Sequence, residues 1–105
     1  MSEKTLWEIL VPSHNNDGIE YRLEWHHAWD EQVRELSGGL TIFKSAKGQW
    51  EDLSGEVFYD KMIPVRIYCS EPDIEKIIQL TMEHYDQHAV MAYQVSKEVK
   101  LIQRD

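Results

Sequence analysis

Cysteine and long apolar runs are scarce in this sequence. Cys69 is the single cysteine, so no disulfide can form within the chain. The first residues, MSEKTLWEILVP, lack the apolar stretch that a signal peptide or a membrane-spanning helix requires. We therefore expect a cytoplasmic protein that has no membrane partner.

Basic residues are also few. Eleven Lys and Arg stand against 19 Asp and Glu, which gives a formal charge of -8, and the basic residues are scattered along the chain. Such a surface repels a phosphate backbone, so nucleic acid is a poor partner. The same acidity leaves open an inhibitor or nucleic-acid mimic, which would gather its carboxylates on one face.

Large side chains are abundant by comparison. The chain is 42% hydrophobic and carries four Trp, five Tyr and two Phe, enough to build a compact core. At 105 residues it is too short for two ordinary domains with separate cores. We expect one domain over residues 1–105, with its core over about residues 5–102.

The first half of the chain predicts a strand and a helix. TLWEILV, residues 5–11, is apolar and precedes Pro12, which is typical of a buried strand that leads into a loop. The next segment has helical spacing at Trp25, Ala28, Trp29, Gln32, Val33 and Leu36. Gly38 and Gly39 follow, where a helix commonly ends.

The second half predicts a hairpin, a helix and a final strand. LTIFKSA and EVFYDKMIPVRIYC are strand-like, and KGQWEDLSG supplies turn residues between them. Ser70 is a candidate N-cap for a helix over SEPDIEKIIQLTMEHYDQH, whose apolar face includes Tyr85. AVMAYQVSKEVKLI is rich in strand formers, with a break expected near Ser96 and Lys97.

This order of elements is the split βαβ arrangement. It predicts an α+β ferredoxin-like fold, βαββαβ, with an antiparallel sheet and two helices on one of its faces. The residues that alternate toward the helices should be Trp7, Ile9, Val11, Ile63, Val65, Ile67 and Cys69.

The opposite sheet face is mixed in character. Apolar side chains, among them Tyr68, surround the two charged residues Glu8 and Arg66, so we expect something to cover this face. One interpretation is a homodimer or other homo-oligomer with a Glu8–Arg66 ion pair inside the interface. The other is a ligand cleft in which Arg66 binds a small anion beside an aromatic wall.

Two histidine patterns raise the question of chemistry. His84 and His88 are spaced to meet one ion, but the glutamate that follows the first histidine of the zinc signature is missing. We expect no metal and no cofactor there, and hydrogen bonding near a helix end instead. His26 and Asp30 could orient a general base, but no nucleophile motif accompanies them, so a surface ion pair is the simpler expectation.

Trp50 lies in the segment that we expect to form a turn. A tryptophan in a turn either covers the edge of the core or is an exposed anchor for a partner, and we favour the first.

Several short motifs over about residues 5–95 resemble one family. They are VP and NNDG after the first strand, GGLT after the first helix, GQW, Asp60, and YDQHAV after the second helix. Together they resemble a group of small bacterial and phage-type ferredoxin-like domains of unknown function. The matching positions are Pro12, Asp17, Gly18, Gly38, Gly39, Thr41, Gly48, Trp50, Asp60, Gln87 and Val90. The resemblance implies the fold but no reaction, and Gln87 is explained as a cap for backbone groups at the helix end.

The leading hypothesis is a small binding or interaction protein that acts as a homo-oligomer through the open sheet face. The alternative is an enzyme with a subunit-interface pocket, in which Arg66 binds an anionic substrate. The acidic inhibitor or mimic is a third. The candidate ligand or interface residues are Glu8, Arg66, Tyr68, Trp50 and Gln87; no catalytic residue is identified.

Overall fold

The computed structural model describes residues 3–104, apart from the side chains of Trp50, Phe58 and Tyr59. Five strands and two helices follow one another in the described part of the chain. Their bounds are β1 (Lys4–Pro12), α1 (Leu23–Ser37), β2 (Thr41–Ile42), β3 (Ala46–Glu51), β4 (Val57–Ser70), α2 (Glu71–His84) and β5 (Ala92–Ser96).

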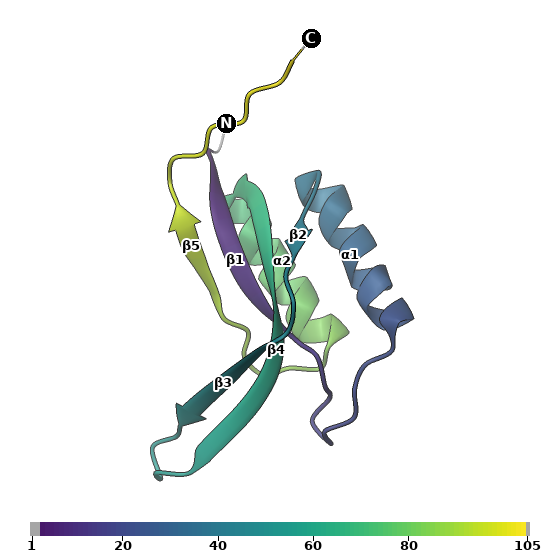
Figure 1. Ribbon diagram of the computed structural model, residues 1–105, viewed down its shortest axis with the longest axis vertical. Helices are drawn as coiled ribbons and strands as arrows, with labels where there is room; N and C mark the ends of the chain where they lie inside the picture. Colours follow the sequence, from purple (N-terminus) through teal and green to yellow (C-terminus); the bar gives the residue numbers. More distant parts are fainter. Residues whose placement is uncertain (1–2, 105) are drawn as a thin grey trace.

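The strands form one antiparallel sheet in the order β2-β4-β1-β5, and β3 pairs with β4 beyond the end of β2. Both helices lie against the same face of this sheet (Figure 1). This is the ferredoxin-like α+β architecture that the order of elements predicted, with β1 and β4 side by side at the centre.

The core lies between the sheet and the helices. Strand alternation places one set of side chains from β1 and β4 under the helices, as predicted, although Trp7 and Ile63 are only partly buried. Trp29 and Val33 of α1 and Ile74 and Ile77 of α2 close the core from the other side. The fully buried set comprises Ile9, Val11, Trp29, Val33, Val65, Ile67, Cys69, Ile74, Ile77, Thr81 and Tyr85.

Both helix boundaries that depend on a single residue are confirmed. Gly38 ends α1 in the left-handed region at φ 87°, and its backbone N–H donates to the carbonyl of Arg34. Ser70 is the N-cap of α2, and its hydroxyl accepts from the backbone N–H of Asp73. The αL glycine and the serine cap satisfy backbone groups that the helices leave free.

The prediction of a turn around Gly48 and Trp50 is wrong. Both residues belong to β3, and the chain reverses over residues 52–56 instead. Asp52 explains the shift: its side-chain oxygen accepts from the backbone N–H groups of Ser54 and Glu56, and Gly55 supplies φ 87°. An Asx-type turn with glycine fixes a reversal more strongly than the glycine of KGQW does.

The β3–β4 hairpin extends well beyond the rest of the sheet. β1 pairs with β4 only from Met62 to Ser70, so the first residues of β4 have β3 as their only strand neighbour in the described chain. We call residues 46–61 the arm; it leaves the body at the lower left of Figure 1. No helix in the described part of the chain is long and apolar enough to cross a membrane.

Candidate functional site

Glu8 and Arg66 form an ion pair on the sheet face that the helices leave open. They are direct partners in the β1–β4 register, and Arg66 Nε lies 3.0 Å from Glu8 Oε1. The carboxylate side chain is 11% exposed and the guanidinium side chain 41%. A nearly buried acid on an uncovered face thus depends on this arginine for its charge partner.

Two aromatic residues complete the surroundings of the pair. The Tyr93 hydroxyl donates to the second carboxylate oxygen of Glu8, from the adjacent edge strand β5. The ring of Phe43, just after β2, lies 5.0 Å from Arg66 Cζ, within range of a cation–π interaction. We call Glu8, Arg66, Tyr93 and Phe43 the sheet-face cluster.

Sequence reasoning found the ion pair but missed Tyr93 and Phe43. Glu8 and Arg66 could be compared because the fold places β1 beside β4, whereas the registers of the two edge strands depend on loops of unknown geometry. Tyr93 lies opposite Glu8 in the register and is 42% exposed; Phe43 is 43% exposed. The sequence signal available for Tyr93 was an aromatic residue in a strand-like segment, and for Phe43 an aromatic residue next to one.

Tyr68, the third residue predicted for this face, is half-buried there. The ammonium group of Lys4 lies 5.9 Å from the centre of its ring. The pairing of Tyr68 with Leu6 and of Pro64 with Leu10 extends the apolar surface along β1 and β4. The face therefore combines an aromatic and aliphatic surface with one guanidinium group, a combination suited to a protein interface or to a planar anionic ligand.

The other two predicted site residues lie apart from this cluster. Trp50 is in β3, and its side chain lies outside the described residues, so the choice between core lid and partner anchor stays a prediction. Gln87 caps the end of α2, as expected: its side-chain amide donates to the carbonyl of Tyr85 at 3.0 Å and to Asn16 Oδ1 at 3.3 Å.

A second group of titratable side chains joins the start of α1 to the end of α2. His26 Nδ1 lies 2.6 Å from the hydroxyl of the fully buried Tyr85. Tyr21 lies edge-on to both rings and donates its own hydroxyl to the Tyr85 carbonyl. The hydrogen-bond partner of His26 is therefore a phenol, and the expected partner Asp30 acts on His26 through its charge.

Burial governs the protonation of this group. Loss of solvent lowers the pKa of His26, and the nearby Asp30 carboxylate opposes that effect only in part. Burial raises the pKa of Tyr85, because loss of solvent disfavours the charged form of each group. A neutral imidazole that accepts a hydrogen bond from the phenol hydroxyl is consistent with both directions, because a buried hydroxyl needs an acceptor.

His84 and His88 do not share a helical face. α2 ends at His84, whose Nε2 lies 2.7 Å from the carbonyl of Trp25, and the imidazole stacks on the Trp25 indole. The expected hydrogen bonding near a helix end is confirmed for His84, whereas His88 is exposed beyond the helix. Tyr85 at the C-cap and Asp86 at φ 51° end the helix before that residue.

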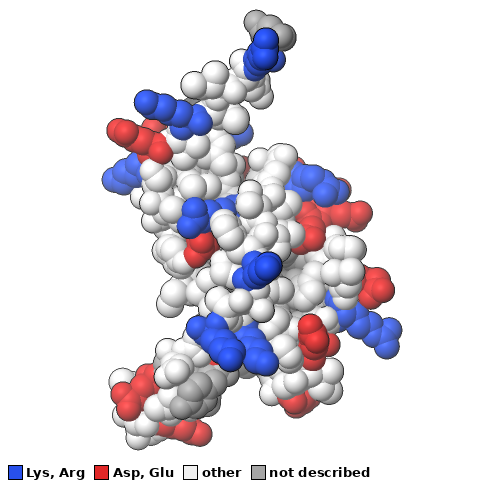
Figure 2. Space-filling view, viewed as in Figure 1, with Lys and Arg blue, Asp and Glu red and all other residues white. Residues whose placement is uncertain are grey.

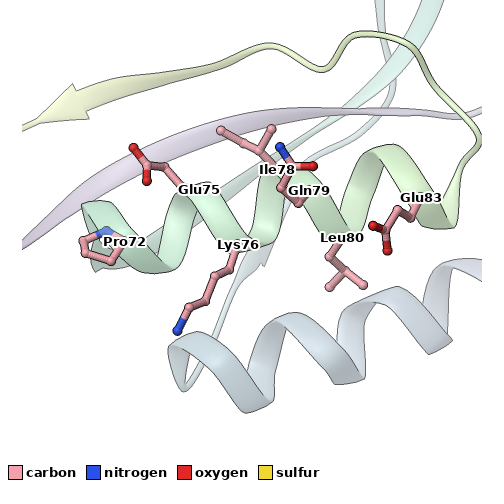
Figure 3. Close-up of a pocket in the computed structure, with 7 residues that line it drawn as sticks. All are labelled: Pro72, Glu75, Lys76, Ile78, Gln79, Leu80 and Glu83. Atoms are coloured by element: carbon pink, nitrogen blue, oxygen red, sulfur yellow. The ribbon is translucent and has the colours of Figure 1, made fainter.

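Two surface hollows lie away from the sheet-face cluster. Figure 3 shows one over α2, where Lys76 and Leu80 point toward α1 while Ile78 points the other way. All of its lining residues belong to α2, so this hollow is open surface and not an enclosed cavity. A second one lies between β1, β5 and the start of α2, beside Trp7. The buried Trp7 Nε1 has no hydrogen-bond partner in the described structure.

Comparison of the chain with known proteins gives a fold. No family model matches the sequence, and no curated protein matches it. Similar solved structures include CutA from Xylella fastidiosa, with a TM-score of 0.67 and 17% identity over 95% of this chain and 88% of that one.

Two further structures have the same architecture. CutA1 of Thermus thermophilus, a divalent cation tolerance protein, gives a TM-score of 0.64 at 12% identity over 97% of this chain and 87% of that one. A phage SAM lyase in complex with S-methyl-5'-thioadenosine gives 0.64 at 15% identity, over 88% and 80%. At these identities the likeness shows that this chain has the ferredoxin-like fold of CutA and of the phage lyase.

Proposed function

We propose that this chain is a binding protein that works as a homo-oligomer, with the open sheet face as the contact between subunits. The supporting observation is the sheet-face cluster: a carboxylate that is 11% exposed lies on a face that no helix covers. A carboxylate with such limited access to solvent, paired with a guanidinium group that is 41% exposed, is typical of an amphipathic interface rather than of free surface.

The exposed apolar residues around the ion pair support the same proposal. Phe43 and Tyr93 are more than two-fifths exposed, and half-buried Leu6, Leu10, Pro64 and Tyr68 surround the ion pair. Contiguous apolar and aromatic patches around a central arginine are characteristic of protein contacts. A second copy of the same face offers the same aromatic residues and the same charge pair.

Native mass spectrometry of the untagged protein tests the proposal. We expect an oligomer that is weakened by Arg66→Ala, since that change leaves Glu8 without its charge partner inside the contact. Lys76→Ala, which removes an exposed cation from α2, is the matched control and should leave the mass distribution unchanged. A monomeric wild-type protein at micromolar concentration would contradict the proposal.

A ligand site on the same face is the second candidate, and the bound state of the phage lyase favours it. That enzyme carries S-methyl-5'-thioadenosine on the same fold. Here Arg66 is tied to Glu8 through Nε, which leaves its two terminal nitrogens to bind a carboxylate or phosphate, while Phe43 and Tyr93 offer surfaces for an adenine ring.

Calorimetric titration distinguishes this candidate. S-methyl-5'-thioadenosine tests the aromatic surfaces alone, and S-adenosylmethionine adds a carboxylate for Arg66. Tighter binding of the second compound, lost in Arg66→Ala, would support an enzyme or ligand-binding role. Failure of both compounds to bind the intact oligomer would remove this ligand class.

A further inference from the structure

The two helices carry most of the net charge of the protein. Each helix has four acidic residues and one basic residue, so together they hold a charge of -6 within the total of -8. The acidic residues are Glu24, Asp30, Glu31, Glu35, Glu71, Asp73, Glu75 and Glu83. Figure 2 shows acidic side chains on the side of the molecule that α1 forms, at the right, and basic ones near the centre of the view, over the sheet.

The spacing of these acids adds repulsion within each helix. Glu31 and Glu35 are four residues apart on α1, and Glu71 and Glu75 are four residues apart on α2; all four are exposed. Like charges at this spacing destabilise a helix. Within the described residues, none of the helix carboxylates lies in a salt bridge. A surface that lowers the stability of the free protein in this way is explained when a partner of opposite charge covers it.

The two helices lie side by side and run in opposite directions. The indole of Trp25, near the start of α1, stacks on His84 at the end of α2. One turn further along α1, Trp29 donates to Thr81, which lies one turn further back on α2. The side of α1 that carries Trp25 therefore faces α2 along the length of the helix.

An apolar strip follows the line where the helices meet. Ala28 and Leu36 lie on the same side of α1 as Trp25, three and eleven residues after it, and Leu80 of α2 points toward α1 (Figure 3). Trp25 is 46% exposed and Leu36 is 38% exposed. We call Trp25, Ala28, Leu36 and Leu80 the helix seam. Lys76 also points toward α1, one turn before Leu80, so the seam is most acidic at the end near Trp25.

The acids border this seam on its outer side. Glu31 and Glu35 follow Ala28 by three and seven residues, which places them beside it on α1. Glu83 lies three residues after Leu80 and has the same relation to it on α2. The surface thus has an apolar centre between two rows of carboxylates.

This combination selects the chemistry of a partner. Nucleic acid and anionic lipid are repelled by the carboxylates, and the helix surface of a second copy carries the same charge. A basic amphipathic helix fits both features: its apolar side packs on the seam, and its Lys and Arg side chains meet the carboxylates at the borders. The helices that form the seam are 15 and 14 residues long, which is enough for several turns of such a partner.

We propose that the helix seam binds a basic amphipathic helix of a partner protein. The sequence predicted that an acidic inhibitor would gather its carboxylates on one face, and the acidic helix surface supports that class of partner. The seam lies on the opposite side of the sheet from the sheet-face cluster (Figure 1). The two contacts can therefore exist in one assembly, and this proposal does not depend on the homo-oligomer.

Calorimetric titration with a synthetic peptide tests the proposal. The probe is a peptide of about 15 residues, built from Leu and Lys so that Leu recurs at helical spacing on one side. A permuted peptide of the same composition without that periodicity is the control for charge alone. In about 0.15 M salt we expect the periodic peptide to bind at least about tenfold more tightly than the permuted one. Equal binding of the two peptides, or no binding of the periodic one, would overturn the proposal.

Two double variants locate the contact. Glu31→Lys with Glu35→Lys reverses the charge at the border of the seam and should raise the dissociation constant of the periodic peptide by at least about tenfold. Glu51→Lys with Glu56→Lys makes the same change in net charge on the arm, where both residues are exposed. The dissociation constant should then stay within about twofold of the wild-type value, because charges far from the contact are screened by salt. Equal weakening by both double variants would show that net charge alone is responsible and would overturn the proposal.

Two-dimensional NMR of the wild-type protein gives a measurement that needs no variant. Addition of the periodic peptide should shift the indole N–H signal of Trp25 and the backbone amides of α1 and α2. Shifts centred on the sheet-face cluster instead would place the peptide on the other face and overturn the proposal. Arg66→Ala, which should weaken the proposed oligomer, should leave peptide binding unchanged, so failure of one proposal can be told from failure of the other.

Discussion

Trp25 and His84 exchange hydrogen bonds between the two helices. The indole Nε1 of Trp25 donates to the carbonyl of His84 at 3.0 Å, and His84 Nε2 lies 2.7 Å from the carbonyl of Trp25. The two rings stack at 4.4 Å between centroids. Because His84 is the last residue of α2, the indole satisfies one of the carbonyl groups that the end of that helix leaves free.

Trp25→Phe should therefore destabilise the protein. The variant keeps an aromatic ring beside His84 but removes the N–H donor, and we expect a loss of about 1 kcal/mol in the free energy of unfolding. Urea denaturation followed by circular dichroism measures the change. Leu23→Ala, at an exposed position of the same helix, is the control for general effects on α1; an equal loss there would argue against the hydrogen bond as the cause.

The buried hydrogen bond between Trp29 and Thr81 predicts a larger effect. Trp29 Nε1 donates to Thr81 Oγ1 at 3.0 Å, and both residues are essentially inaccessible. Thr81→Val keeps the shape but leaves the indole N–H unpaired, at a cost of about 1–3 kcal/mol. Thr81→Ser retains the hydroxyl, so its stability should exceed that of Thr81→Val in the same urea experiment. The reverse order would contradict this account.

His26 should make stability depend on pH. Its folded-state pKa lies below the ordinary value of 6.5, so the unfolded chain takes up the proton first as the pH falls. The stabilising effect of the neutral imidazole is complete above pH 6.5 and declines as the pH drops from there through the folded-state pKa. Thermal unfolding between about pH 7.5 and about pH 5 should show this decline.

Two substitutions isolate that contribution. His26→Gln removes the titrating group and should flatten the decline relative to the wild type. Tyr85→Phe removes the donor to neutral His26, so the pKa of His26 should rise, as proton NMR of the imidazole would show. An unchanged pH profile in His26→Gln would exclude the imidazole as its source.

Gly38→Ala should cost about 1 kcal/mol of stability, because φ 87° is strained for any residue with a Cβ. Gly39→Ala is the matched control: that residue has no left-handed backbone angle, and a Cβ there would meet nothing within 4 Å. We expect it to be close to neutral in thermal unfolding. Equal destabilisation by both changes would show that the C-cap geometry is not responsible.

The order of elements could be predicted because local signals agree with it. Ser70 marks the start of α2, Gly38 marks the end of α1, and the alternation of Val65, Ile67 and Cys69 identifies the buried face of β4. Each of these signals acts within a few residues of chain. The ion pair on the other face followed from topology, which brings β1 and β4 together.

Features that depend on long-range register could not be predicted in the same way. The contact of Tyr93 with Glu8 needs the exact offset of β5, and the hydrogen bond of Tyr85 to His26 needs the relative rotation of two helices. The turn was misplaced by a few residues because two glycine-containing stretches competed, and the side chain of Asp52 decided between them.

β4 runs from the arm to Ser70, and the same Ser70 is the N-cap of α2. No linker residue separates the strand from the helix, so the hairpin, the central strand and the second helix follow one another without a loop between β4 and α2. A displacement of the arm would therefore be transmitted along β4 to the start of α2. The hydrogen bonds between Trp25 and His84 would pass it on to α1. A molecule bound at the tip of the arm could thus affect both helices without contacting either.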